Sequence, residues 1–155
     1  MRLLACFLSI VLVSCSSTRE SGNNPDGAPA DTKAALDHAA AEPGAIRTPS
    51  GLVYRELRAG TGESPKATDT VTVNYRGTLT NGTEFDSSYK RNEPAKFPLN
   101  QVVPCWTEGL QKMKVDGKSR LVCPASLAYG DRGAPPDIPG GATLIFEVEL
   151  LAIGR

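Results

Sequence analysis

The side chains able to do chemistry are few in this chain, and their types exclude several kinds of enzyme. A single histidine, His38, lies in a low-complexity region, which excludes a histidine-based triad or a multi-histidine metal site within this sequence. Four cysteines stand at positions 6, 15, 105 and 123 without a CxxC pair, so no zinc site is predicted. Basic and acidic residues number 17 each, which gives no electrostatic footprint for nucleic acid. We predict no metal, no cofactor and no nucleic-acid partner.

The only tryptophan, Trp106, belongs to a segment whose pattern predicts a short helix. Pro104 fixes the backbone angle that suits a first helical turn. Trp106, Leu110 and Met113 recur at i, i+4 and i+7, which places one apolar stripe on one helical face. A single short helix among strands must lie against a sheet to bury that stripe. From spacing alone, Trp106 is either a plain core residue or the floor of a pocket.

The rest of the compact region reads as short strands joined by turns. Residues 70–79 alternate with a period of two, the segment 143–151 places Leu144, Phe146, Val148 and Leu150 on one face, and Asn81-Gly82 is a strong hairpin signal. A long loop rich in proline and glycine separates the last two strands, and such loops carry function in small domains. The predicted fold class is α+β, a curved antiparallel sheet wrapped around one short α-helix. The predicted strands cover 51–57, 70–79, 84–88, 95–99, 119–123 and 143–151.

The amino terminus has the features of an export signal. A basic start is followed by an apolar run of about a dozen residues. That run is too short to span a bilayer as a helix, which needs roughly 20 residues. The run ends at Cys15, and 12–15 resembles the bacterial lipobox, in which the cysteine is lipidated. The alternative is an ordinary signal peptide. We therefore expect a lipoprotein signal peptide at 1–14 and an exported protein anchored to a bacterial membrane through Cys15. Ser16 resembles sorting to the outer membrane, facing the periplasm.

The next segment, 15–48, is rich in Ser, Ala, Gly, Pro and Asn and is predicted to be a flexible tether. Its composition allows a transient helix at 31–42, but Leu36 is the only large apolar residue there, so nothing is expected to hold that helix to the domain. The compact domain is predicted to cover 49–155.

Three stretches together resemble the FKBP family of peptidyl-prolyl cis-trans isomerases. They are 73–77 (VNYRG) leading to 85–88 (FDSS), then 102–106 (VVPCW), then 127–130 (LAYG) with Ile138-Pro139 and 146–150. The resemblance implies a half-barrel of antiparallel strands around one short helix, with the ligand pocket between them. It also implies proline-containing polypeptides as substrates and macrolides as inhibitors of the same pocket.

Carried over by position, the resemblance implies a pocket with Trp106 as its floor. Asp86 and Tyr129 are its polar groups, and the Val103 amide is a donor to a ligand carbonyl, so these four are the predicted catalytic residues. The substrate-binding residues implied are Tyr75, Phe85, Arg91, Phe97, Val102, Ile138 and Phe146. Ala95 and Ala134 depart from an aromatic residue and a histidine common at those positions, which bears on ligand affinity.

Cys105 and Cys123 remain after the export and lipidation signals are set aside. In an exported chain they form either a disulfide that closes a short loop or two small buried thiols.

No long helical dimerisation arm is visible, so we expect a monomer. Two alternatives to an enzyme stay open, namely a chaperone that holds proline-containing chains in the same pocket and a surface interaction lipoprotein.

Overall fold

The computed structural model describes residues 29–154, with side chains from residue 32 onward. The predicted signal segment 1–14 and Cys15 lie outside the described residues. The helices are α1 (Pro29–Ala40), α2 (Ser88–Arg91) and α3 (Pro104–Gln111), with short 3-10 turns at Leu99–Gln101, Ala125–Leu127 and Gly130–Arg132. The strands are β1 (Ala45–Arg47), β2 (Val53–Arg58), β3 (Thr70–Leu79), β4 (Glu84–Ser87), β5 (Ala95–Pro98), β6 (Lys118–Cys123) and β7 (Leu144–Gly154).

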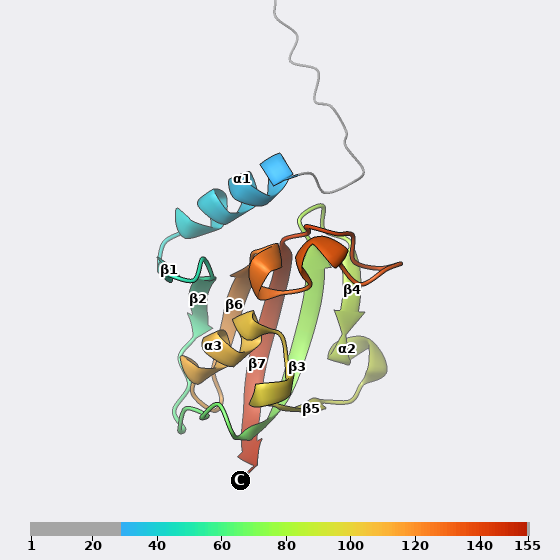
Figure 1. Cartoon of the computed structure of the whole chain (residues 1–155). Helices are drawn as coiled ribbons and strands as arrows, with labels where there is room; N and C mark the ends of the chain where they lie inside the picture. Colours follow the sequence, from blue (N-terminus) through green and yellow to red (C-terminus); the bar gives the residue numbers. More distant parts are fainter. Residues whose placement is uncertain (1–28, 155) are drawn as a thin grey trace, which may run out of the picture.

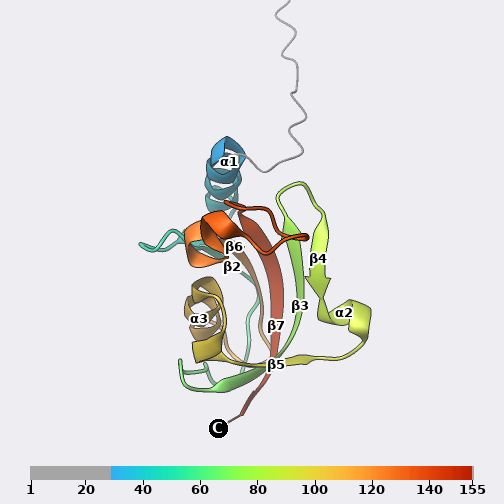
Figure 2. The same cartoon turned by 45° about the vertical axis from the view of Figure 1, so that its right-hand side comes forward.

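All seven strands form one antiparallel sheet, and α3 lies on its concave side (Figures 1 and 2). The strand order is β1-β2-β6-β7-β3-β4; β5 pairs with the first half of β3, whereas β4 pairs with its second half. The long strands β3 and β7 run beside each other over ten paired positions, from Thr70↔Gly154 to Leu79↔Leu144. This arrangement confirms the predicted α+β fold of a curved sheet wrapped around a short helix.

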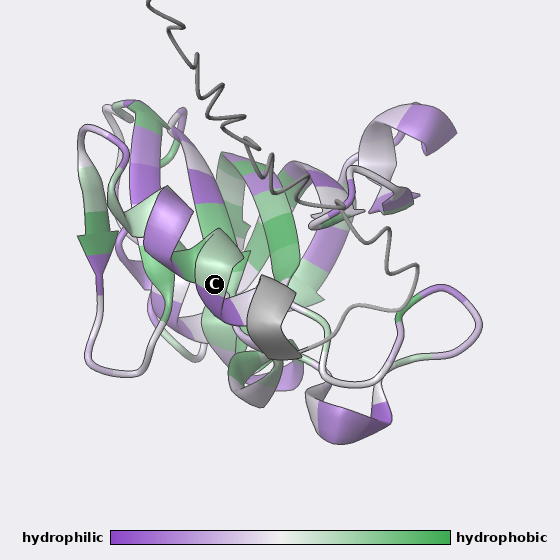
Figure 3. Cartoon of the chain, turned by 90° about the horizontal axis from the view of Figure 1, so that it is seen from above, coloured by the Kyte–Doolittle hydropathy of each residue, from purple (hydrophilic) through white to green (hydrophobic). Residues whose placement is uncertain are grey.

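The main hydrophobic core fills the space between α3 and the concave face. Figure 3 shows alternating hydrophobic and hydrophilic bands along the strands, which is the expected two-residue period of a sheet with one buried face. The predicted apolar faces of β3, β7 and α3 are confirmed as buried. The buried side chains they contribute are Val71, Val73 and Tyr75 on β3, Trp106 and Leu110 on α3, Met113 just after it, and Leu144, Phe146, Val148 and Leu150 on β7.

Among residues 29–154, no helix has the length and apolarity that crossing a membrane requires.

The prediction that residues up to 48 form a free tether is wrong for 29–47. Helix α1 packs on the outer face of the sheet, where Leu36 and Ala39 are only 6% and 8% exposed. They form a second apolar cluster with Val53 of β2 and Val122 of β6. Strand β1 then pairs with β2 and extends the sheet by one strand. The described part of the folded unit therefore begins at residue 29.

Pairing of distant strands explains why the docking of α1 on the sheet was not predicted. Val53 and Val122 are opposite one another in the β2–β6 register, so their apolar patch exists only after the strands have paired. Polar contacts then hold the segment at both ends: Asp37 pairs with Arg47 at 2.8 Å, and Glu42 pairs with Arg55 of β2. Leu36 and Ala39 give α1 enough apolar contact to dock because the sheet provides the remaining apolar surface.

We predict that Leu36→Ala lowers the free energy of unfolding by about 2 kcal/mol, at the low end for a buried leucine because α1 lies at the margin of the fold. Denaturant unfolding measures the change. Lys33→Ala is the matched control on the same helix, since Lys33 makes only an exposed ion pair with Asp37 and its loss should change stability by no more than about 0.5 kcal/mol. Equal effects of the two substitutions would show that α1 is not docked.

Candidate active site

A cavity of about 330 Å³ opens between α3 and the concave face of the sheet, a volume within the usual range for small-ligand sites. Its walls come from β3, β4, β5, β7, the start of α3 and the loop before β7. Most of the lining is apolar or aromatic, with a few polar groups among it. The lining residues are Tyr75, Phe85, Asp86, Phe97, Gln101, Val102, Val103, Trp106, Tyr129 and Phe146.

Trp106 is surrounded by aromatic rings that fix its orientation. Tyr75, Phe97 and Phe146 meet the indole edge to face, with ring centroids 5.2, 5.5 and 5.3 Å away. Such pairs stabilise by about 0.5–1.5 kcal/mol beyond area burial. The indole Nε1 is buried without a hydrogen-bond partner among the described residues, and the surrounding ring faces are weak acceptors for such a donor. Trp106 is therefore both a core residue and a wall of the cavity.

Gly77 makes room for two of the cavity's rings, a role that sequence reasoning missed. A Cβ built at this position would lie 2.6 Å from Cζ of Phe85 and 2.9 Å from Cε1 of Phe146, which is closer than side chains tolerate. These two rings pack edge to face at 5.6 Å. The missing side chain thus lets both aromatic rings come close to β3.

The polar group of the cavity joins Asp86, Tyr75 and Arg91. The Tyr75 hydroxyl donates to Oδ2 of Asp86, and Arg91 donates to Asp86 Oδ1 at 2.6 Å and to the Tyr75 hydroxyl oxygen at 2.9 Å. Burial acts to raise the pKa of Asp86, but the hydrogen bonds from Tyr75 and Arg91 outweigh it, so this pKa lies below its ordinary value. Burial, and then the bond to Asp86, raises the pKa of Tyr75. At neutral pH the site therefore contains a carboxylate and a protonated phenol.

The β3–β4 pair places Asp86. Gly77 is opposite Asp86 in the register, and beyond it the buried Ser88 accepts the Tyr75 backbone N–H at 2.9 Å, which continues the link between the two segments. The adjacent Ser87 backbone N–H donates to Asp86 Oδ1 at 2.8 Å. These bonds hold the carboxylate at the rim of the cavity.

Val103 offers a backbone donor at the entry of α3. It is the N-cap of the helix, and its carbonyl accepts the Trp106 N–H at 2.9 Å. Its own N–H has no acceptor among the described residues, although the residue lines the cavity. Pro104 follows as the first helical residue and has no N–H to compete. The Val103 amide is therefore available to a carbonyl oxygen of a ligand.

Nine of the eleven predicted pocket residues line this cavity. Arg91 stands one layer out, where it contacts Asp86 and Tyr75 rather than the cavity itself. Ile138 is buried in the core and forms a β-bridge with Ala134, so the structure does not place it in the lining. Gln101 lines the cavity without having been predicted, because a side chain just before the helix carries no periodic signal. The roles assigned to these residues stay predictions.

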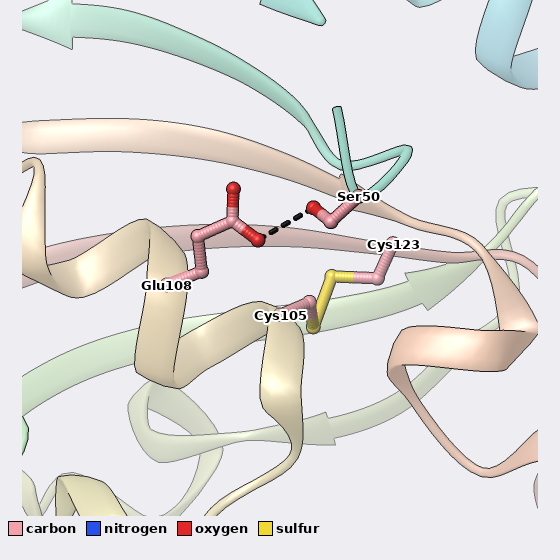
Figure 4. Close-up of a disulfide and its surroundings, with 4 residues drawn as sticks. All are labelled: Ser50, Cys105, Glu108 and Cys123. Atoms are coloured by element: carbon pink, nitrogen blue, oxygen red, sulfur yellow. Dashed lines mark hydrogen bonds between the residues drawn. A yellow bond between two sulfur atoms is a disulfide. The ribbon is translucent and has the colours of Figure 1, made fainter. Parts of the chain in front are cut away.

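The two cysteines form a disulfide between the first turn of α3 and the end of β6, as Figure 4 shows. Cys105 and Cys123 are both fully buried, and their Cα atoms are 5.9 Å apart. Of the two alternatives, a disulfide or two buried thiols, the structure contains the disulfide.

Comparison with known proteins agrees with the site. The profile of the FKBP-type peptidyl-prolyl cis-trans isomerase family matches residues 61–151, so this chain belongs to that family. The isomerase FkpA of Aeromonas hydrophila is 57% identical over 112 residues, which cover 72% of this chain and 41% of that protein. The chain thus spans less than half the length of this curated relative.

Solved structures give the same fold. The crystal structure of FkpA from Escherichia coli matches with a TM-score of 0.79 and 50% identity, covering 81% of this chain and 59% of that one. A peptidyl-prolyl cis-trans isomerase from Pseudomonas syringae pv. tomato matches with a TM-score of 0.75 and 37% identity, covering 80% of this chain and 91% of that one. The FKBP-like half-barrel is therefore the fold of this chain.

We predict that Gly77→Ala lowers the free energy of unfolding by about 1–3 kcal/mol, because the added methyl group must displace the Phe85 and Phe146 rings. Denaturant unfolding measures this change, and near-UV circular dichroism reports the displaced rings. Gly154→Ala on β7 is the matched strand glycine, since a Cβ there would lie at an ordinary 3.6 Å from the Thr70 carbonyl oxygen. A Gly77→Ala protein as stable as the Gly154→Ala protein would contradict the close packing.

Proposed function

We propose that this protein is a peptidyl-prolyl cis-trans isomerase that accelerates rotation about X–Pro bonds in exported polypeptides. The observation that carries the proposal is the unpaired amide of Val103 beside the aromatic cavity built on Trp106. The cavity has room for an apolar ring, and the Val103 N–H donates a hydrogen bond to the carbonyl oxygen next to that ring. Membership of the FKBP family supports this function.

Isomerisation of an X–Pro bond requires from the protein only a complementary shape and fixed dipoles. Rotation about an X–Pro bond crosses a barrier of about 18–20 kcal/mol because it breaks amide conjugation. No covalent intermediate is needed, since binding the twisted amide better than the planar one lowers the barrier. Lowering it by about 7 kcal/mol gives a rate gain of order 10⁵. A rigid apolar cavity with a few oriented donors suits this task.

Each part of the cavity has a role in the proposed mechanism. The Trp106 floor and its neighbouring rings hold the proline ring, and the low polarity around them favours the less polar carbonyl of a twisted amide. The Val103 amide donates to a substrate carbonyl, which fixes the peptide backbone. Tyr129 is 43% exposed at the rim, where its hydroxyl can reach the peptide from the open side. Asp86 fixes the Tyr75 hydroxyl beside the cavity, and Arg91 supports both groups from outside it.

We predict that Asp86→Asn lowers kcat/KM for a short X–Pro peptide about tenfold, because an asparagine side chain lacks the negative charge that aligns Tyr75 and Arg91. The cis-to-trans rate of the peptide measures it, with circular dichroism to verify the fold. Glu84→Gln is the matched control on the same strand, since Glu84 pairs with Arg76 and Lys90 away from the cavity. An inactive wild-type protein would refute the proposed function, whereas equal activity of the two variants would refute only the role of Asp86.

The proposal includes export and lipid anchoring through Cys15. The apolar run that ends at Cys15 supports it, and so does the Cys105–Cys123 disulfide, because structural disulfides occur mainly in proteins outside the cytosol. Several acyl chains on one cysteine would hold the protein to a membrane, at about 0.8 kcal/mol per buried CH₂. We place the folded part in the periplasm, as a monomer tethered to the outer membrane. Macrolides are proposed inhibitors because the apolar cavity suits a bulky ring system.

We predict that cells fed radioactive palmitate label the wild-type protein and leave Cys15→Ala unlabelled, because the substitution removes the acylated thiol. Gel autoradiography of the purified protein measures the label. Cys6→Ala is the control, since Cys6 lies within the expected signal peptide and its loss should leave the label in place. Label that persists in the Cys15→Ala protein would rule out this anchor.

A further inference from the structure

Helix α3 carries the floor of the cavity but has little to hold its position by itself. It has eight residues, its N-cap Val103 provides no side-chain capping bond, and Gly109 weakens its middle. Isolated helices of this length are marginal in water. The position of α3 must therefore come from its tertiary contacts.

Besides the apolar packing, three specific links tie α3 to its surroundings. Glu108 accepts from the Ser50 hydroxyl at 2.5 Å, and the Thr107 hydroxyl donates to the Leu99 carbonyl at 2.6 Å. The third link is the disulfide between Cys105 and Cys123, which Figure 4 shows beside the Ser50–Glu108 bond. The first two leave from later positions of the helix, whereas the disulfide is the link nearest the helix entry and is covalent.

The disulfide connects two segments that carry residues of the cavity. Cys105 directly precedes Trp106 and follows Val103 by two residues. Cys123 is the last residue of β6, and the turns after it lead to Tyr129 on the cavity rim. The bond thus joins the helix entry to the base of the rim loop. Both cysteines are fully buried, so a reductant in solution reaches the bond only when the fold opens.

We propose that the Cys105–Cys123 disulfide is a positioning element of the active site, beyond any effect on stability. It fixes the first turn of α3 against the end of β6, so that the Trp106 ring and the Val103 amide keep one geometry. Activity gains from this rigidity because displacements of about 1 Å at reacting groups cost up to 100-fold in rate. The inference deepens the proposed isomerase function and depends on it for its kinetic part alone.

The bond is removed in two ways, both in the full-length chain. The double variant Cys105→Ala/Cys123→Ala removes both sulfur atoms. Wild-type protein unfolded and refolded with excess dithiothreitol keeps both sulfurs as thiols: the two S–H groups of the reagent supply two electrons and two protons, and the reagent leaves as a cyclic disulfide. Agreement between the two forms would assign the effect to the bond rather than to packing of sulfur.

Two readouts separate positioning from stability, at a temperature where circular dichroism shows every form fully folded. We expect kcat/KM for the X–Pro peptide to fall five- to tenfold in both forms without the bond. We also expect the ¹⁹F resonance of 5-fluorotryptophan at Trp106, the only tryptophan, to change from one sharp line to a broadened or split one. Trp106 reports its own mobility whether or not the protein catalyses a reaction.

Two control variants complete the test. Val53→Ala lies on the outer face under α1, so it should lower the unfolding temperature and leave both readouts unchanged. Ser50→Ala removes a link of α3 remote from Val103 and should change kcat/KM less than twofold. Unchanged kcat/KM and one sharp ¹⁹F line in the forms without the bond would overturn the positioning role, even if their unfolding temperature fell. An inactive oxidised wild type would instead refute the proposed function, and the ¹⁹F line would still test the positioning of Trp106.

Discussion

The edge-to-face packing of Trp106 against Tyr75, Phe97 and Phe146 is the aromatic contact on which both the core and the cavity depend. It closes the core from the side of α3, and the rings left partly uncovered become the cavity. A domain of this size has little apolar surface to spare, so the same side chains serve stability and binding. A change at Trp106 therefore affects folding and the shape of the cavity together, and separating the two requires substitutions around it.

Rigidity is the property that the surroundings of this cluster have in common. Gly77 lets two rings pack close to β3, and the cross-strand register holds Asp86 where Tyr75 and Arg91 reach it. A site that acts by binding a twisted amide has no nucleophile to compensate for poor geometry, so its efficiency depends on preorganisation. The disulfide at Cys105 contributes to the same rigidity, because it lies in the turn of α3 between Val103 and Trp106, which line the cavity.

The segment before the sheet is part of the fold and not only a connection. Helix α1 covers Val53 and Val122 on the outer face, and Thr32 donates to the Gly141 carbonyl at 3.3 Å, in the loop that returns from the cavity rim. Figures 1 and 2 show α1 at the same end of the molecule as this loop. The segment 29–47 thus contacts the sheet on the face opposite α3.

The sequence by itself determined most of the half-barrel and of the cavity. Two-residue alternation along β3 and β7 and the 3.6-residue stripe of Trp106 and Leu110 are local patterns, and they predicted which faces are buried. The family resemblance added the pocket residues. Only the tertiary structure decided what depends on pairs far apart in the chain: the outer patch that docks α1, the layer in which Arg91 stands, and the bond between Cys105 and Cys123. These features depend on contacts between segments far apart in the chain or in different elements, such as the strand register that brings Val53 beside Val122, and no local pattern records such contacts.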